Sequence, residues 1–159
     1  MLKPDKQPES FERAKERALW YLDRSSLTEK ALRERLMRSF VPGVVDRVIE
    51  RLIDYGFIND EDYARRYCES CMRSNISKRE TVQKLYLKGI PIDLAKSTVE
   101  EYTWDMVAQI KALLQKKYSS KLNDEQSIKK VFAALLRKGF GYGDIKDALK
   151  EYSTEIEEM

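Results

Sequence analysis

Apolar residues recur every three or four positions along most of this chain, which is the spacing of amphipathic helices. The segment 136–149, LRKGFGYGDIKDAL, places a glycine-rich turn between two such stripes. The segments 36–49, LMRSFVPGVVDRVI, and 86–99, YLKGIPIDLAKSTV, align with it without a gap at a step of 50 residues. Three copies at a fixed step predict a tandem repeat, in which each unit buries part of its apolar face against its neighbours.

Each copy follows a further apolar stripe, at 14–22, 61–73 and 104–118. No stretch alternates apolar and polar residues in the manner of a strand, so we expect no sheet. The pattern predicts an all-α fold, built from three tandem three-helix repeats of the helix-turn-helix kind that form an elongated, curved body. We expect a flexible N-terminal segment at 1–13, repeats at 14–56, 57–102 and 103–152, and an acidic C-terminal tail at 153–159.

Helix start and stop signals support these boundaries. A Ser, Thr or Asn followed three residues later by Glu or Gln is typical of a capping box at a helix N-terminus. This rule predicts boxes at Ser26 with Glu29, Ser77 with Glu80 and, more weakly, Asn123 with Gln126. Ser39, Gly89 and Gly139 occupy the aligned position after a helix, where glycine adopts a left-handed conformation without strain.

The glycines at 139, 141 and 143 raise the alternative of a phosphate-binding loop. Walker A requires G-x-x-x-x-G-K-[ST], and the dinucleotide fingerprint requires G-x-G-x-x-G after a strand. Neither pattern is met, because no third glycine follows at the required spacing and a helix precedes the run. We therefore interpret the run as a turn between two helices.

Composition narrows the possible chemistry. The chain has 159 residues, of which 42% are hydrophobic and 36% charged. We find no secretion signal and no apolar run of about 20 residues, so we expect a cytoplasmic protein. It contains no histidine, which excludes Ser–His–Asp and Cys–His nucleophiles. Its two cysteines, Cys68 and Cys71, are too few for a zinc site, so we expect core residues. We therefore predict no enzyme activity, no metal and no cofactor.

Asp60, Glu61 and Asp62 form an acidic cluster that could suggest a metal site. Acidic residues at a helix N-terminus are expected from the helix dipole alone, and no second carboxylate cluster completes a cage. We interpret this cluster as the start of a helix.

Positive charge is concentrated in the middle of the chain. Residues 62–90 carry seven Lys or Arg against three Asp or Glu, and tyrosines lie between them. Such a segment fits either a phosphate-rich or acidic partner, or a solvated helix face with aromatics in the core. The candidate partner-binding residues are Arg65, Arg66, Arg73, Lys78, Arg79, Lys84 and Lys88, with Lys116, Lys117 and Lys121 as a further basic group.

The order and spacing of several motifs resemble the RecX family. The most specific match is at the first junction, where Gly56, Phe57, Ile58, Asn59, Asp60, Tyr63 and Ala64 fit the family pattern. The second repeat matches L-x-x-K-G-I through Leu85, Lys88, Gly89 and Ile90. The third repeat matches at Trp104, Ala108, Lys117, Tyr118, Arg137, Gly139, Phe140 and Tyr142. The resemblance covers about residues 14–150.

This resemblance implies a regulator of bacterial RecA recombinase. It implies three three-helix repeats that bind in the groove of the RecA–DNA filament and limit filament growth, ATPase activity and strand exchange, thereby regulating DNA repair and recombination. We expect a monomer that touches single- or double-stranded DNA through its basic faces and does not bind membranes. The alternative is a helical-repeat protein that binds DNA or RNA directly.

Overall fold

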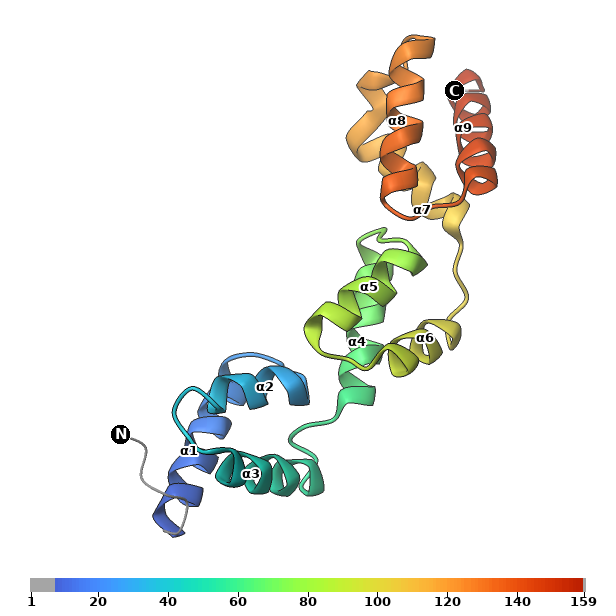
Figure 1. Cartoon of the computed structure of the whole chain (residues 1–159). Helices are drawn as coiled ribbons and strands as arrows, with labels where there is room; N and C mark the ends of the chain where they lie inside the picture. Colours follow the sequence, from blue (N-terminus) through green and yellow to red (C-terminus); the bar gives the residue numbers. More distant parts are fainter. Residues whose placement is uncertain (1–7, 159) are drawn as a thin grey trace. The chain divides into compact units, whose positions relative to one another are not determined.

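A computed structural model describes residues 8–158, and Figure 1 follows this part of the chain from helix to helix. These residues contain no strand, which confirms the predicted all-α fold of three-helix repeats. The helices are α1 (Pro8–Arg24), α2 (Glu29–Leu36) and α3 (Pro42–Asp54), then α4 (Asp60–Arg73), α5 (Lys78–Lys88) and α6 (Ile92–Glu100), then α7 (Met106–Leu113), α8 (Glu125–Arg137) and α9 (Tyr142–Glu157).

The helix ends differ from the expected boundaries in three places. Helix α1 begins at Pro8, within the segment expected to precede the first repeat, and residues 1–7 lie outside the described residues. Helix α9 continues to Glu157, into the expected acidic tail. The stripe at 104–118 forms α7, which continues as a π-helical turn at Leu114–Tyr118 and a 3₁₀ turn at Ser119–Lys121.

Contacts divide the chain into two compact units, and the second repeat contributes to both. The first unit contains the chain up to Arg66 together with Leu85–Ala95, and the second contains Tyr67–Lys84 together with the chain from Lys96 onward. Among the described residues, no helix is long and apolar enough to cross a membrane.

Each unit has its own apolar core, formed by the inward stripes of its helices. Burying a Leu, Ile or Val side chain contributes roughly 1.5–3 kcal/mol, so these stripes supply most of the driving force for packing. The first core contains Ala14, Ala18, Leu32, Leu36, Val44, Val45, Val48, Ile49, Leu52 and Ile58. The second contains Ile110, Leu113, Leu114, Val131, Leu135, Phe140, Ile145, Ala148 and Tyr152.

In the first unit, the threonine that caps the N-terminus of α2 is hydrogen-bonded to the end of α5. Thr28 accepts the Ala31 N–H at 3.2 Å, and its hydroxyl donates to the Lys88 carbonyl at 2.6 Å. Gly89 follows with a φ of +104°, and a Cβ at that residue would lie 2.8 Å from Thr28 Oγ1. Glycine is therefore required at 89 for its backbone conformation and for this close approach.

The second unit repeats this arrangement, with Ser77 in the role of Thr28. Ser77 accepts the Glu80 N–H at 3.1 Å, and its hydroxyl donates to the Lys138 carbonyl at 2.6 Å. Gly139 has a φ of +93°, and a Cβ there would lie 2.7 Å from Ser77 Oγ. We call these two contacts the Thr28 bridge and the Ser77 bridge. Each satisfies a carbonyl at a helix C-terminus that has no partner within its own helix.

The sequence predicted one of the three caps correctly. Ser77 caps α5 as expected. Helix α2 is capped by Thr28 and not by Ser26. Helix α8 is capped by Asp124, which accepts the Ser127 N–H at 2.7 Å, whereas the Asn123 amide donates to the Ser120 carbonyl at 3.0 Å.

Candidate partner-binding surface

The two arginines in the first half of α4 are paired with carboxylates of the preceding helical turn. Arg65 Nη2 lies 3.8 Å from Glu61 Oε2, and Arg66 Nε lies 3.0 Å from Asp62 Oδ2. Arg66 also donates to Ser26 Oγ at 3.4 Å. These pairs are exposed and contribute little stability, but they reduce the net charge that this part of α4 presents.

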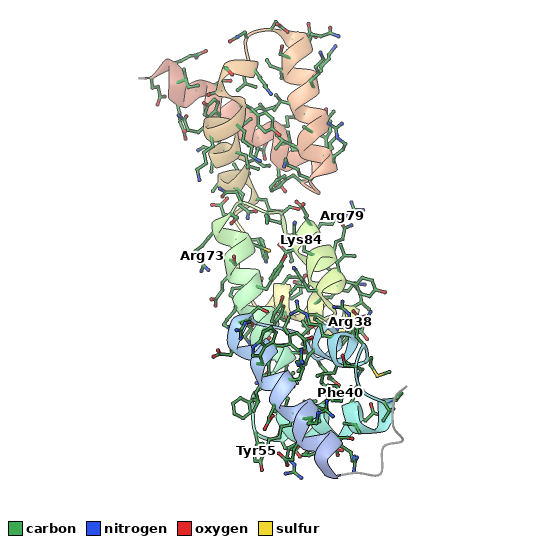
Figure 2. The ribbon with its side chains drawn as sticks, turned by 90° about the vertical axis from the view of Figure 1, so that its left-hand side faces the viewer. Arg38, Phe40, Tyr55, Arg73, Arg79 and Lys84 are labelled. Atoms are coloured by element: carbon green, nitrogen blue, oxygen red, sulfur yellow. The ribbon has the colours of Figure 1, made fainter. Side chains whose placement is uncertain are left out.

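Three further candidates flank the turn between α4 and α5. Arg73 ends α4, and Lys78 and Arg79 begin α5. The Lys78 ammonium pairs with Glu100 at 2.7 Å, whereas Arg73 and Arg79 are exposed. Figure 2 shows Arg73 and Arg79 on opposite sides of this part of the molecule. The structure therefore does not gather these three charges into one patch.

The last two candidates of the second repeat lie further along α5 and differ in exposure. Lys84 is half-buried; burial raises the pKa of the Cys71 thiol, and the charge of the Lys84 ammonium acts in the opposite direction. Lys88 ends the helix and is exposed, while its carbonyl accepts the Thr28 bridge. The Thr28 bridge thus fixes the backbone that carries the Lys88 ammonium.

The basic group of the third repeat lies on the irregular end of its first helix. Lys116 and Lys117 are exposed on the π-helical turn, and Lys121 is exposed on the 3₁₀ turn. Lys111, one helical turn earlier, pairs with Glu151 at 3.4 Å and with Glu155. π-helical turns are rare in proteins, and those that occur are often found at functional sites. Lys116, Lys117 and Lys121 therefore remain candidate partner-binding residues.

The cysteines and the acidic cluster have structural roles. Burial is the main cause that raises the pKa of Cys68 to about 11, and it also raises the pKa of Cys71, so both thiols are protonated near neutral pH. Asp60 Oδ1 accepts the Glu29 N–H at 2.9 Å, and the Asn59 side chain accepts the Asp62 N–H at 3.0 Å. Among residues 8–158, no group of three or more Cys, Asp or Glu side chains could hold a metal ion.

A basic and aromatic stripe on α1 is not among the candidate residues that the sequence indicated. Arg13, Arg17, Trp20 and Arg24 follow one another at steps of four, three and four, which places them on one helix face. Trp20 is 47% exposed, and the guanidinium carbon of Arg24 lies 3.8 Å from the centroid of its indole. The regular spacing of three arginines around a tryptophan was the signal that could have identified this face.

Sequence comparisons connect the repeats with a known family. Residues 14–52 match the family described as RecX, first three-helix domain, and residues 105–149 match RecX, third three-helix domain. The curated regulatory protein RecX of Clostridioides difficile is 31% identical over 154 residues, a match that covers 94% of this chain and 73% of the relative. Those of Streptococcus pneumoniae and Bacillus velezensis are 32% and 30% identical, and the chain spans 58% of the length of each.

Solved structures support the same relationship at the level of the fold. The crystal structure of RecX from Lactobacillus salivarius superposes with a TM-score of 0.82 at 25% identity, covering 93% of this chain and 99% of that one. A second structure, of regulatory protein RecX, gives a TM-score of 0.79 at 21% identity, covering 89% of this chain and 73% of that one. On the evidence of these matches, the chain belongs to the RecX family of regulatory proteins.

Proposed function

We propose that this protein binds RecA-type recombinase filaments on DNA and limits their growth, ATP hydrolysis and strand exchange, thereby regulating DNA repair and recombination. The observation that carries this proposal is family membership, since relatives of about 30% identity over most of the chain bear the name regulatory protein RecX. A regulatory role follows from family membership itself.

The protein acts in this proposal by binding and not by catalysis. The absence of histidine from the sequence removes the commonest general base. Burial keeps both thiols protonated at neutral pH, so neither is an available nucleophile. The described surface carries exposed lysines and arginines on successive repeats, which can bind a negatively charged partner.

The exposed basic residues would pair with acidic recombinase surface or with DNA phosphates. Because Arg73, Arg79, Lys116 and Lys117 are exposed, water and salt screen their interactions strongly over about 8–10 Å. Such charges mainly speed encounter and set orientation, so we expect inhibition to weaken as salt concentration rises. We expect the protein to act as a monomer.

ATP hydrolysis by recombinase on single-stranded DNA tests the proposal. When the protein is added at a small fraction of the recombinase concentration, the fractional loss in the rate of ATP hydrolysis should be much larger than the molar ratio of this protein to recombinase. An unchanged rate, together with tight binding to bare DNA, would refute filament regulation and favour direct nucleic-acid binding.

Charge-reversal variants locate the contact. Arg73→Glu with Arg79→Glu removes two exposed charges of the second repeat and leaves the Lys78–Glu100 pair intact. We expect this double variant to inhibit more weakly at unchanged helicity. The comparison variant is Lys116→Glu with Lys117→Glu, which makes the same change in net charge at the candidate residues of the third repeat. If only this variant loses inhibition, the contact lies on the third repeat and not on the second.

A further inference from the structure

The stripe on α1 combines an exposed indole with three guanidinium groups. Trp20 is 47% exposed although tryptophan is highly buried on average, and Arg13, Arg17 and Arg24 lie on the same helix face. We call these four residues the Trp20 surface. Core packing does not explain an exposed indole with three arginines on the same helix face.

The side chains of the Trp20 surface are already ordered around the ring. The guanidinium carbon of Arg24 lies 3.8 Å from the indole centroid, and that of Arg17 lies 5.9 Å away. Tyr21 meets the indole edge-on, with centroids 5.3 Å apart and an interplanar angle of 72°. Cation–π and edge-to-face contacts of this kind hold an aromatic ring in place before any ligand arrives.

A hollow lies beside the ring. It has a volume of about 480 Å³ and is lined by Arg13, Glu16, Arg17, Trp20 and Phe40. Figure 2 shows Phe40 next to the ribbon of α1. Arg24 is not among the lining residues, so the guanidinium that stacks on the indole leaves the hollow open. The hollow is therefore lined by two aromatic residues, two arginines and one glutamate.

This combination suits a flat ring that is linked to an anion. Aromatic side chains bind unpaired bases by stacking, and arginines beside them pair with the phosphates of the same strand. In a duplex both faces of each base are already stacked, so a duplex offers the hollow only phosphates. A short acidic peptide would meet the arginines but would leave the indole and Phe40 without a stacking partner.

We propose that the Trp20 surface binds single-stranded nucleic acid, with one unpaired base in the hollow against Trp20 and Phe40 and the adjacent phosphates on Arg13 and Arg17. This activity goes beyond filament regulation, because it requires no recombinase. Stacking accepts any base, so the surface has little sequence preference.

Tryptophan fluorescence tests this site in the intact chain. The chain has two tryptophans, so Trp104→Phe leaves Trp20 as the only reporter and Trp20→Phe leaves Trp104. Trp104 donates its indole N–H to the Val99 carbonyl at 2.8 Å, which anchors it within its own unit. Titration with a 20-nucleotide oligothymidylate should quench Trp20 to a plateau and leave Trp104 unchanged.

The affinity for the same labelled oligonucleotide provides the second measurement. Trp20→Ala should weaken binding about tenfold, the loss expected for one stacked base, and Arg17→Glu should weaken it further while increasing the penalty of added salt. The matched control is Tyr55→Ala, since Tyr55 is 61% exposed in the same repeat with the Arg51 guanidinium carbon 5.9 Å from its ring. This control should bind like the unaltered protein, and circular dichroism should give the same helicity for all variants.

Three results would overturn the proposal. The first is an equal loss of affinity in Trp20→Ala and Tyr55→Ala, which would make the effect one of general surface charge or stability. The second is tighter binding of a 20-base-pair duplex than of the single strand. The third is saturable quenching of Trp20 by poly-glutamate at the same affinity, which would make the surface a site for acidic polypeptides. None of these measurements contains recombinase, so their outcome is separate from that of the filament proposal.

Discussion

Replacing Gly89 by alanine tests the Thr28 bridge, and replacing Gly56 by alanine provides the comparison. Both glycines lie in the first unit and both have positive φ, +104° at Gly89 and +78° at Gly56. A Cβ at Gly56 meets nothing within 4 Å, whereas a Cβ at Gly89 would lie 2.8 Å from both Thr28 Oγ1 and Lys30 Cβ. Both substitutions carry a backbone penalty, which is at least as large at the wider φ of Gly89, and only Gly89→Ala adds the close contact.

The expected cost of each substitution follows from these contacts. A left-handed conformation costs an alanine about 1–2 kcal/mol, which is the whole penalty at Gly56. At Gly89 the methyl group must also displace Thr28, which weakens its hydrogen bond to Lys88 by about 1 kcal/mol and its cap on α2 by about 1 kcal/mol. Gly89→Ala should therefore lower the free energy of unfolding by roughly 2 kcal/mol more than Gly56→Ala.

Urea unfolding followed by Trp20 fluorescence measures this difference. A Trp104→Phe background makes Trp20 the only tryptophan, so the signal reports the first unit. Equal losses of stability in the two glycine variants would refute the reasoning, because they would mean that α2 and the end of α5 do not approach each other as closely as the structure places them.

Two further predictions concern the second unit. Ser77→Ala should lower its stability by about 2 kcal/mol through loss of the cap and the bridge. In a double-mutant cycle followed by Trp104 fluorescence, it should also remove the part of the Gly139→Ala loss that comes from the contact with Ser77 Oγ, and strictly additive losses would contradict the Ser77 bridge. The pKa of the Cys68 thiol is raised from 9.0 to about 11 in the folded protein, so between these pH values the folded state holds the proton more tightly than the unfolded state. Its contribution to the free energy of unfolding is therefore fully present below pH 9 and is lost as the pH rises toward 11. The urea midpoint of a Cys68→Ala variant should therefore decline less over this interval, and an identical decline would assign it to other groups.

The repeat architecture was predictable because it depends on the spacing of apolar residues and glycines within short segments. The apolar stripes recur at a 50-residue step, and Gly139 ends its helix in the left-handed conformation that the alignment indicated. The interpretation of its run as a turn between two helices is confirmed, since α8 ends at Arg137 and α9 begins at Tyr142. Periodicity and turn chemistry depend on neighbouring residues, which the sequence displays directly.

The capping residues could not be predicted in the same way, because hydrogen bonds to residues far along the chain determine which of two nearby residues caps the helix. Ser26 with Glu29 satisfies the spacing of a capping box, but Thr28 is bound to the Lys88 carbonyl and the Glu29 N–H to Asp60. These contacts span 60 and 31 residues and fix the start of α2 at Glu29. The requirement for glycine at 89 has the same non-local origin.

The candidate site illustrates the same limit. The basic residues of the second repeat were evident from composition, but their pairing with Glu61, Asp62 and Glu100 and the separation of Arg73 from Arg79 depend on how the helices fold together. Trp20 lies in the apolar stripe at 14–22, and its 47% exposure in the structure shows that it is not a core residue. The assignment of the basic residues to partner binding stays a prediction.

The most direct test of the central claim is the growth of recombinase filaments on single-stranded DNA, observed with fluorescent recombinase at single-filament resolution. We predict that this protein, present at far less than one copy per recombinase subunit, slows or stops filament extension, and that the Arg73→Glu, Arg79→Glu double variant does so less effectively. Filaments that extend at an unchanged rate while saturated with the protein would contradict this prediction.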